Sequence, residues 1–336
     1  MGGPYFNTVY GRGLVEELAR IATPPYLVVT MEDLWPLVKD QLSHNLGCLY
    51  LSTTLEYKDL LEAEKSIPPV KSVVGIGGGI ALDVAKFFTW LRNLPLFQLP
   101  TSTSVNAAFA HKSAIRKGGV VQYVGWAVPE AVYVDFDLIQ SAPIYINRAG
   151  VGDIFCIHTA HYDWKLATER GKEKKWPWDE GLAEEAQGFL QEVRKNTKEV
   201  SKMSETGIRL VMKTHRWSGA TYHNSGWNPR FIEGSEHFFF YNLEYLTKKK
   251  FLHGEPVCLG IILVSTLQDN DPDGITKSIR EVGVRVRPEE IAVTKNEVIE
   301  AFVTARDFAE RENLFYSVLN EKKVDSAFVE SVLQKI

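Results

Sequence analysis

Three segments place a side chain that can bind a metal ion close to a glycine. They are Gly150–Asp153 (GVGD), Gly234–His237 (GSEH) and His253–Glu255 (HGE). Each lies at an expected helix start or in the turn before one. One aspartate and two histidines could supply the three ligands of a catalytic zinc site, which leaves a fourth position open. The alternatives are a helix cap for Asp153, a buried core position for His237 and a turn contact for His253.

A glycine cluster follows the clearest predicted buried strand, Ser72–Ile76 (SVVGI). Gly77–Gly79 come next, and IALDVAKFFTWL after them has a helical pattern. Glycines let the backbone approach a phosphate, and a helix N-terminus offers free N–H groups. The spacing is not that of the GxGxxG fingerprint, so the glycines alone favour a phosphate cradle and a tight turn equally. Asp83 and Lys86, one turn apart on this helix, are by themselves typical of a surface ion pair.

Four hydroxyl residues follow another predicted strand, Leu96–Leu99 (LFQL). The segment Pro100–Ser104 reads PTSTS. Open α/β sheets bind ligands at the carboxyl ends of their strands, so this segment is a candidate ligand-binding loop. A hydroxyl-rich turn that caps a helix is the alternative, and it would be favoured if the segment stood alone.

The elements that must position these residues change in character along the chain. Up to residue 145, short apolar runs alternate with helical stretches, which predicts an α/β domain with a largely parallel sheet. The further runs are Tyr26–Thr30, Cys48–Ser52 and Ala131–Val134, with an amphipathic stretch at Leu14–Ile21. From residue 146 helical patterns dominate. They cover Asp153–Thr168, Gly181–Ser204, Ser235–Thr247, Pro256–Leu267 and Asp325–Gln334, and Thr294 with Glu297 forms a capping box. We therefore predict an α/β domain over 1–145 and a helical domain over 146–336.

The composition excludes several classes of protein. The 336 residues carry 38 basic and 42 acidic side chains, a net charge of −4, which argues against a nucleic-acid-binding protein. The longest apolar run, PVCLGIILVSTL, has 12 residues and is too short for a membrane span. No signal peptide is visible at the amino terminus. Three widely spaced cysteines without a CxxC motif favour a reducing compartment, so we expect a cytoplasmic protein.

Five motifs in a fixed order resemble one family. GIGGGIALDVAK, PTSTS, AGVGDIFCIHTAHYDW, EGSEHFFFYNLE and FLHGEPVCLG are similar to segments of the polyol and iron-containing alcohol dehydrogenase superfamily, which also contains dehydroquinate synthase. The AGVGD…DW and GSEH segments are most similar to the glycerol-1-phosphate dehydrogenase branch. The resemblance covers about 70–260. It implies a Rossmann-like parallel-sheet domain, then a helical metal-binding domain, with the active site in the cleft between them.

The resemblance also implies the roles of individual residues. Asp153, His237 and His253 would be the catalytic metal ligands. Iron-dependent members have a further histidine one turn after the aspartate, where this chain has Ile157, and a three-ligand zinc site is therefore favoured. NAD or NADP would be the cofactor. The residues that would bind it are Gly77, Gly78, Gly79, Asp83, Thr101, Ser102 and Ser104.

The substrate positions depart from the family pattern. Asn106 stands where the branch usually has an aspartate that contacts substrate, and Tyr241 stands where a further histidine is expected. Val105 and Ala110 differ as well. A phosphorylated substrate would need a cationic anchor, for which Lys112 and Arg230 are candidates because they flank the predicted site. Ordinary surface charges are the alternative for both.

The cofactor preference stays open. An acidic residue directly after the second strand would bond the ribose 2′-hydroxyl of NAD and repel the 2′-phosphate of NADP. Met31 occupies that place, with Glu32 and Asp33 after it. Met31 removes the repulsion, whereas Glu32 could restore it.

The family resemblance implies a metal-dependent NAD(P)-linked dehydrogenase of a small polyol or polyol phosphate, of the glycerol-1-phosphate or dihydroxyacetone phosphate type. We expect a homo-oligomer that acts on a small-molecule substrate. A cyclase similar to dehydroquinate synthase, which eliminates phosphate and uses NAD transiently, is the main alternative. Asn106 and Tyr241 also keep open a family member that binds ligand without turnover.

Overall fold

The computed structural model describes residues 6–118 and 120–336, which form two compact units. Unit 1 runs up to Asn147 and also includes His215–Asn224, and unit 2 contains Arg148–Thr214 and Ser225–Ile336. The prediction that there is no signal peptide concerns the amino terminus, and residues 1–5 lie outside the described residues. The assignment of a dinucleotide-binding domain to 1–145 and a metal and substrate domain to 146–336 stays a prediction.

Unit 1 is built on a sheet of six parallel strands in the order β1-β8-β5-β4-β2-β3. The strands are β1 (Thr8–Gly11), β2 (Tyr26–Thr30), β3 (Leu46–Leu51), β4 (Ser72–Gly77), β5 (Leu96–Pro100) and β8 (Ala131–Asp135). The predicted α/β fold class with a parallel sheet is confirmed. The sequence analysis missed β1 and an antiparallel hairpin, β6 (Ser113–Lys117) and β7 (Val120–Val124), because neither has a continuous apolar run.

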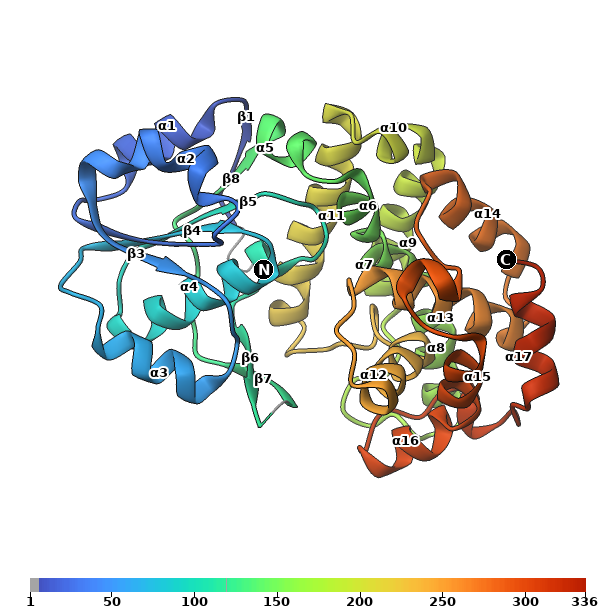
Figure 1. Ribbon diagram of the computed structural model, residues 1–336. Helices are drawn as coiled ribbons and strands as arrows, with labels where there is room; N and C mark the ends of the chain where they lie inside the picture. Colours follow the sequence, from blue (N-terminus) through green and yellow to red (C-terminus); the bar gives the residue numbers. More distant parts are fainter. Residues whose placement is uncertain (1–5, 119) are drawn as a thin grey trace. The chain divides into compact units, whose positions relative to one another are not determined.

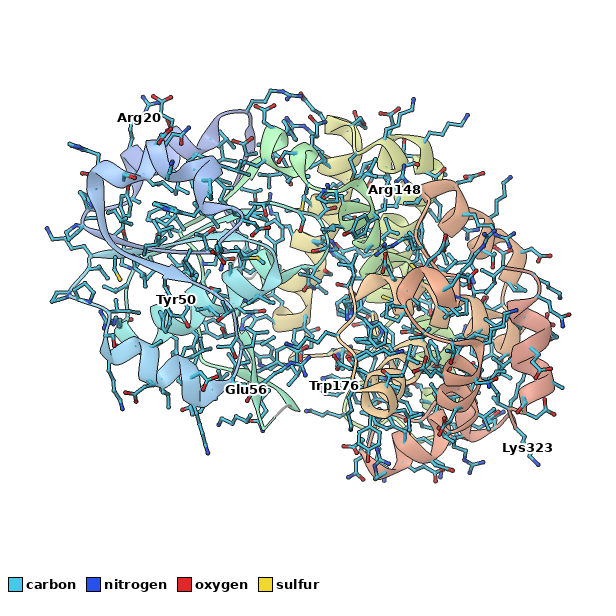
Figure 2. The ribbon with its side chains drawn as sticks, viewed as in Figure 1. Arg20, Tyr50, Glu56, Arg148, Trp176 and Lys323 are labelled. Carbon is cyan, nitrogen blue, oxygen red and sulfur yellow. The ribbon has the colours of Figure 1, made fainter. Side chains whose placement is uncertain are left out.

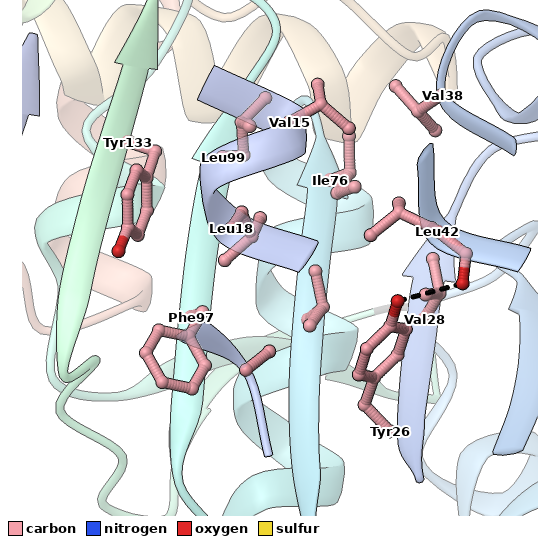
Figure 3. Packing of buried hydrophobic residues seen from close by; sticks show 12 residues of the cluster. Val15, Leu18, Tyr26, Val28, Val38, Leu42, Ile76, Phe97, Leu99 and Tyr133 are labelled. Atoms are coloured by element: carbon pink, nitrogen blue, oxygen red, sulfur yellow. Dashed lines mark hydrogen bonds between the residues drawn. The ribbon is translucent and has the colours of Figure 1, made fainter. Parts of the chain in front are cut away.

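Alternation along the strands explains the two layers of helices on this sheet. Val28 of β2 packs in one cluster with residues of α1 (Leu14–Ile21) and α2 (Trp35–Leu42), as Figure 3 shows. Leu27 and Val29 point the other way, toward α3 (Tyr57–Lys65) and α4 (Gly79–Arg92). Both faces of the sheet are therefore covered, as is usual for parallel sheets (Figure 1).

Unit 2 is helical, and its described residues contain no strand. Two short helices come before it. Of these, α5 (Phe136–Ser141) lies in unit 1, and α6 (Ile144–Ala149) crosses the boundary between Asn147 and Arg148. The helices of unit 2 are α7 (Gly152–Phe155), α8 (Ile157–Glu169), α9 (Glu180–Lys195), α10 (Thr197–Lys202), α12 (Ser235–Thr247), α13 (Gly254–Gln268), α14 (Pro272–Val282), α15 (Lys295–Val303), α16 (Ala305–Arg311) and α17 (Ser326–Leu333). A further helix, α11 (Glu205–Asn224), starts in unit 2, and its residues from His215 onward belong to unit 1. Charged side chains such as Arg20 in unit 1 and Lys323 in unit 2 project from the surface (Figure 2).

The helix predictions differ from the structure mainly at interruptions. The helix expected over Asp153–Thr168 is divided at Cys156 into α7 and α8, and that over Gly181–Ser204 is divided at Asn196 into α9 and α10. The capping box of Thr294 and Glu297 is confirmed at the start of α15. The apolar run after Pro256 lies in α13, whose residues are almost all buried. Across the described chain, no helix has the length and apolarity needed to cross a bilayer.

Candidate active site

A pocket of 390 Å³ in unit 1 lies at the carboxyl ends of β2, β4, β5 and β8. Open α/β sheets bind ligands at this edge. Met31, Asp33 and Leu34 line it after β2, and the segment Leu138–Ile146 contributes residues after β8. Five of the residues predicted to bind the dinucleotide also line it. They are Gly78, Gly79, Thr101, Ser102 and Ser104.

The glycines of the β4–α4 turn have different reasons to be glycine. A Cβ at Gly75 would lie 2.6 Å from the Cβ of Ala85, and Gly77 has a φ of +148° with Ala81 Cβ 2.8 Å from such an atom. Close packing and backbone conformation therefore explain these two. A Cβ at Gly78 would meet only Ser102 Oγ, at 4.0 Å. No described residue occupies that space, which fits a ligand phosphate held at the N-terminus of α4.

The PTSTS loop is held in place by Thr103, its fourth residue. The backbone N–H of Thr103 donates to Asn147 Oδ1 over 2.9 Å, and its hydroxyl donates to the Asn147 carbonyl over 2.8 Å. His215 bonds the Thr103 carbonyl over 3.0 Å. Ser102 and Ser104 bond each other and line the pocket. Thr103 thus anchors the loop, whereas Ser102 and Ser104 on either side of it line the pocket.

Asp83 and Lys86 form a buried ion pair, and the interpretation as a surface pair is wrong. Lys86 Nζ lies 2.7 Å from Asp83 Oδ1, and both side chains are nearly inaccessible. Burial raises the pKa of Asp83, while Lys86 opposes that shift. Asp83 also accepts a hydrogen bond from the N–H of Ala114 at the edge of the hairpin. Asp83 and Gly77 are not among the residues that line the pocket, and their contact with a cofactor stays a prediction.

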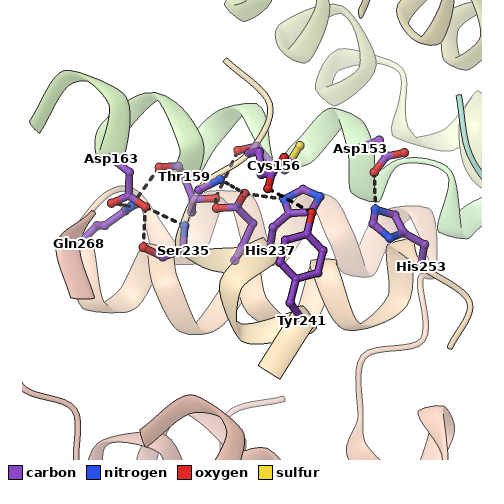
Figure 4. A network of polar contacts seen from close by, with 12 residues as sticks. Asp153, Cys156, Thr159, Asp163, Ser235, His237, Tyr241, His253 and Gln268 are labelled. Carbon is purple, nitrogen blue, oxygen red and sulfur yellow. Dashed lines mark hydrogen bonds and ion pairs between the residues drawn. The ribbon is translucent and has the colours of Figure 1, made fainter. Parts of the chain in front are cut away.

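In unit 2 the three predicted metal ligands come together. One donor atom from each of Asp153, His237 and His253 lies within 4.8 Å of the other two, and no second cluster of this kind occurs in the described parts of the chain. His253 Nε2 is 2.8 Å from Asp153 Oδ1, and the two imidazole rings are 5.4 Å apart between centroids. Figure 4 shows the three side chains projecting from α7, α12 and the start of α13.

Two glycines explain how Asp153 reaches His253. A Cβ at Gly254 would lie 1.8 Å from the carbonyl oxygen of Ala149, and a Cβ at Gly152 would lie 2.5 Å from the Cα of Gly254. The backbones at the starts of α7 and α13 therefore touch, which no residue with a side chain would allow. This is why the motifs GVGD and HGE place a ligand beside a glycine.

The donor set suits a divalent ion such as zinc. It offers one carboxylate oxygen and two imidazole nitrogens, which is the ligand chemistry of catalytic zinc sites. The side chain of His253 is 28% exposed, so a further ligand could approach from that side. Ile157, at the place of the fourth ligand of iron-dependent relatives, is fully buried and apolar.

His237 is hydrogen-bonded to the carboxylate of Glu236. Its Nδ1 lies 2.8 Å from Oε1 of Glu236, which is completely buried. Burial lowers the pKa of His237, but the hydrogen bond to Glu236 and its charge outweigh this effect, and the pKa is raised. Glu236 was not predicted to be a functional residue, although the GSEH motif contains it.

The candidate substrate residues are divided between the two units, with Arg230 and Tyr241 in unit 2. Tyr241 lies beside the cluster, with its ring centroid 6.0 Å from that of His237 and its hydroxyl donating to Glu233 over 3.1 Å. Arg230 is fully buried, 3.3 Å from Glu173, and donates to backbone carbonyls. These contacts are typical of a structural arginine. Asn106 and Lys112 belong to unit 1 and are partly exposed. Substrate contacts of all four stay predictions.

Comparison with known proteins gives the same family as the motifs. Residues 29–143 match the family model described as iron-containing alcohol dehydrogenase. A glycerol-1-phosphate dehydrogenase [NAD(P)+] of Thermoplasma volcanium is 31% identical over 248 residues, which are 73% of this chain and 69% of the relative. One from Hyperthermus butylicus is 30% identical over 76% of this chain and 72% of the relative. The glycerol dehydrogenase structure from Schizosaccharomyces pombe has a TM-score of 0.72 at 18% identity, covering 100% of this chain and 90% of its own.

This level of identity over most of both chains is decisive for the family, while the structural likeness supports the fold. The chain belongs to the iron-containing alcohol dehydrogenase superfamily, in the branch of the glycerol-1-phosphate dehydrogenases.

Proposed function

We propose that the chain is a metal-dependent NAD(P)-linked dehydrogenase that interconverts a small polyol phosphate, of the glycerol 1-phosphate type, with its ketone. The cluster of Asp153, His237 and His253 carries this proposal, together with the relatives named glycerol-1-phosphate dehydrogenase. The pocket of unit 1 supports it, because Gly78 leaves room for the dinucleotide phosphates at the start of α4.

Each part of the site has its own task. A divalent ion held by the three ligands would supply a Lewis acid that polarises the hydroxyl or carbonyl of the substrate. The glycine turn would bind the pyrophosphate, and Thr101, Ser102 and Ser104 would orient the nicotinamide end of the cofactor. Tyr241 would contact the substrate at the position where the family resemblance implies a histidine. The bound dinucleotide would supply or accept the hydride that interconverts the hydroxyl and the carbonyl of the substrate.

Zinc, a cytoplasmic location and a homo-oligomer are further proposals. The three-ligand nitrogen and oxygen set, with Ile157 in the place of a fourth ligand, favours zinc over iron. The three cysteines, Cys48, Cys156 and Cys258, are all free, which suits a reducing compartment. The edge strand β7 exposes Val121 and Tyr123, as surfaces that pair with another chain often do.

The test is the oxidation of NADH and NADPH by the zinc-loaded protein with dihydroxyacetone phosphate, followed by absorbance. We expect steady, stoichiometric consumption that stops on chelation and is absent in His253→Ala. A cyclase would regenerate its cofactor, so net consumption separates the two reactions. Absence of consumption with both cofactors, in a preparation shown to contain zinc, would overturn the proposed reaction.

The substitution Asn106→Asp tests the altered substrate position. If this position sets the choice of substrate, restoring the family's aspartate should raise turnover of glycerol or dihydroxyacetone phosphate. Unchanged kinetics on both substrates would remove Asn106 from the explanation.

A further inference from the structure

Glu236 is a buried carboxylate in direct contact with His237. It is 0% exposed, and the described chain offers it no ion pair with a lysine or arginine. Oε1 accepts from the N–H of Gly234 over 2.8 Å and contacts Nδ1 of His237. Oε2 accepts from the hydroxyl of Thr159 over 2.8 Å. Burying a carboxylate costs on the order of several kcal/mol in desolvation, unless a positive charge compensates it.

The hydrogen bonds fix the tautomer of His237. An ionised carboxylate only accepts hydrogen bonds. Nδ1 of His237 must therefore carry a proton and donate the hydrogen bond to Oε1 of Glu236. The other ring nitrogen, Nε2, then keeps its lone pair for a cation. With a divalent ion bound, the two negative charges of Asp153 and Glu236 would be balanced. No described lysine or arginine pairs with Glu236, so a cation held by the cluster would be the lasting positive charge beside it.

Glu236 is itself held by α8. Thr159 lies one turn before Asp163, so the two side chains share one face of that helix. Asp163 accepts from both the N–H and the hydroxyl of Ser235, over 2.8 and 2.5 Å. Gln268, at the end of α13, donates to the Thr159 carbonyl over 3.0 Å and to Asp163 over 3.2 Å. Figure 4 shows this network running along α8 toward the cluster.

The same helices carry both the ligands and this support. Asp153 lies on α7, directly before α8, and His253 precedes α13, which ends at Gln268. His237 follows Ser235 and Glu236 at the start of α12. Burial raises the pKa of Asp163 to about 6, although hydrogen bonds from Ser235 and Val318 oppose it.

We propose that Glu236 is a positioning residue for the metal site: it orients His237, fixes its tautomer and balances the charge of the bound cation, while Thr159 and the Asp163–Ser235 pair hold Glu236 in place. This inference rests on the metal site of the proposed function. It does not depend on the substrate or on turnover.

The experiment compares Glu236→Gln with Glu233→Gln in the full chain. Zinc affinity is measured by competition with a chromophoric chelator, without cofactor or substrate. Glutamine keeps the size and one acceptor but removes the charge, and we expect zinc binding about 10–100-fold weaker, as for other outer hydrogen-bond partners. Glu233 contacts Tyr241 rather than His237, so Glu233→Gln should change zinc affinity less than about threefold, below that same range.

Two further readouts separate positioning from a merely structural role. The metal-free Glu236→Gln protein should melt at the same or a higher temperature than the metal-free parent, because an uncompensated buried charge is gone. Its Co²⁺ form should show an altered d–d spectrum. Parental zinc affinity in Glu236→Gln, or an equal loss in Glu233→Gln, would overturn the proposal.

If Glu236→Gln does not fold, Thr159→Val gives the same test. Valine keeps the β-branched shape and removes only the hydroxyl that Glu236 accepts from. We expect zinc binding about threefold to tenfold weaker, below the range for losing a direct partner of a ligand. Parental affinity in this variant would contradict the support by α8. Zinc binding without turnover would refute the proposed reaction and leave this inference standing.

Discussion

The candidate cofactor pocket of unit 1 and the candidate metal cluster of unit 2 are assembled in opposite ways. The pocket presents backbone and hydroxyl groups from loops that all leave one edge of a parallel sheet. The cluster needs three specific side chains from positions 153, 237 and 253, brought within 4.8 Å by touching helix starts and a buried polar network. A sheet edge gathers its loops by topology alone, whereas the cluster depends on individual close contacts. We therefore expect the cluster to be more sensitive to single substitutions.

The largest effect should follow the loss of a ligand. His253→Ala is expected to weaken zinc binding by more than about 100-fold, beyond the 10–100-fold typical of an outer hydrogen-bond partner. Asp153→Asn and His237→Ala should also sharply lower bound zinc. The measurement is metal content after dialysis, with the exposed His44→Ala as a control for losing a histidine elsewhere. Normal zinc occupancy in all three ligand variants would refute the assignment.

The next largest effect should come from Gly254, where the backbones at the starts of α7 and α13 are in contact. Gly254→Ala would place a Cβ 1.8 Å from the Ala149 carbonyl oxygen, so the two helix starts must separate. We expect a loss of about 3 kcal/mol in the free energy of unfolding, at the upper end of ordinary overpacking, together with weaker zinc binding. Chemical denaturation measures the first effect.

Gly188→Ala in α9 is the matched control for this substitution, because a Cβ there meets nothing within 4 Å. It should be neutral or stabilise by up to about 1 kcal/mol through helix propensity. If Gly254→Ala proved as stable as Gly188→Ala, the touching backbones would not be needed to hold Asp153 beside His253.

These contrasts show what the sequence could and could not predict. The strands β2, β4 and β5 have continuous apolar runs because both faces of the sheet are covered, and their pattern was sufficient to predict them. β1 and the β6–β7 hairpin were missed because neither forms such a run: β1 is mostly half-exposed, and buried residues alternate with more exposed ones along β6. The breaks at Cys156 and Asn196 were missed because the helical pattern continues across both.

The candidate site shows the same division. The motifs singled out Asp153, His237 and His253, whose donor atoms lie close together in the structure, while their binding of a metal stays a prediction. Glu236 was missed because its role depends on partners more than 70 positions away, such as Thr159. No local sequence pattern predicts which residues from distant parts of the chain lie close together in the fold. The burial of Arg230 was missed for the same reason, because its partners Glu173 and Tyr316 are far apart in the chain.

A smaller effect is expected at the pocket, where Gly78→Val and Gly75→Ala should behave differently. Gly78→Val should lower NAD(P)H affinity about tenfold, or about 1.4 kcal/mol, by filling the space meant for phosphate, while the fold stays intact. Gly75→Ala, with its Cβ 2.6 Å from that of Ala85, should cost about 1–3 kcal/mol of stability. Fluorescence titration and thermal melting measure the two. Unchanged NAD(P)H affinity in Gly78→Val would refute the phosphate cradle.

The smallest effect concerns the choice between NADH and NADPH. Asp33 lines the pocket after β2, whereas its exposed neighbour Glu32 is not among the lining residues. A carboxylate at this place accepts a hydrogen bond from the ribose 2′-hydroxyl and repels a 2′-phosphate. The parent should therefore prefer NADH.

Asp33→Ser should shift the ratio of the two dissociation constants toward NADPH by about tenfold, or about 1.4 kcal/mol, while Glu32→Gln should leave the ratio nearly unchanged. Titration of both cofactors against both variants checks this. If Glu32→Gln produced the larger shift, the 2′-position of the cofactor would lie toward Glu32. A residue of the loop after β2 that does not line the pocket would then set the preference. Because this loop is separate from Gly78, either result would leave the phosphate cradle unaffected.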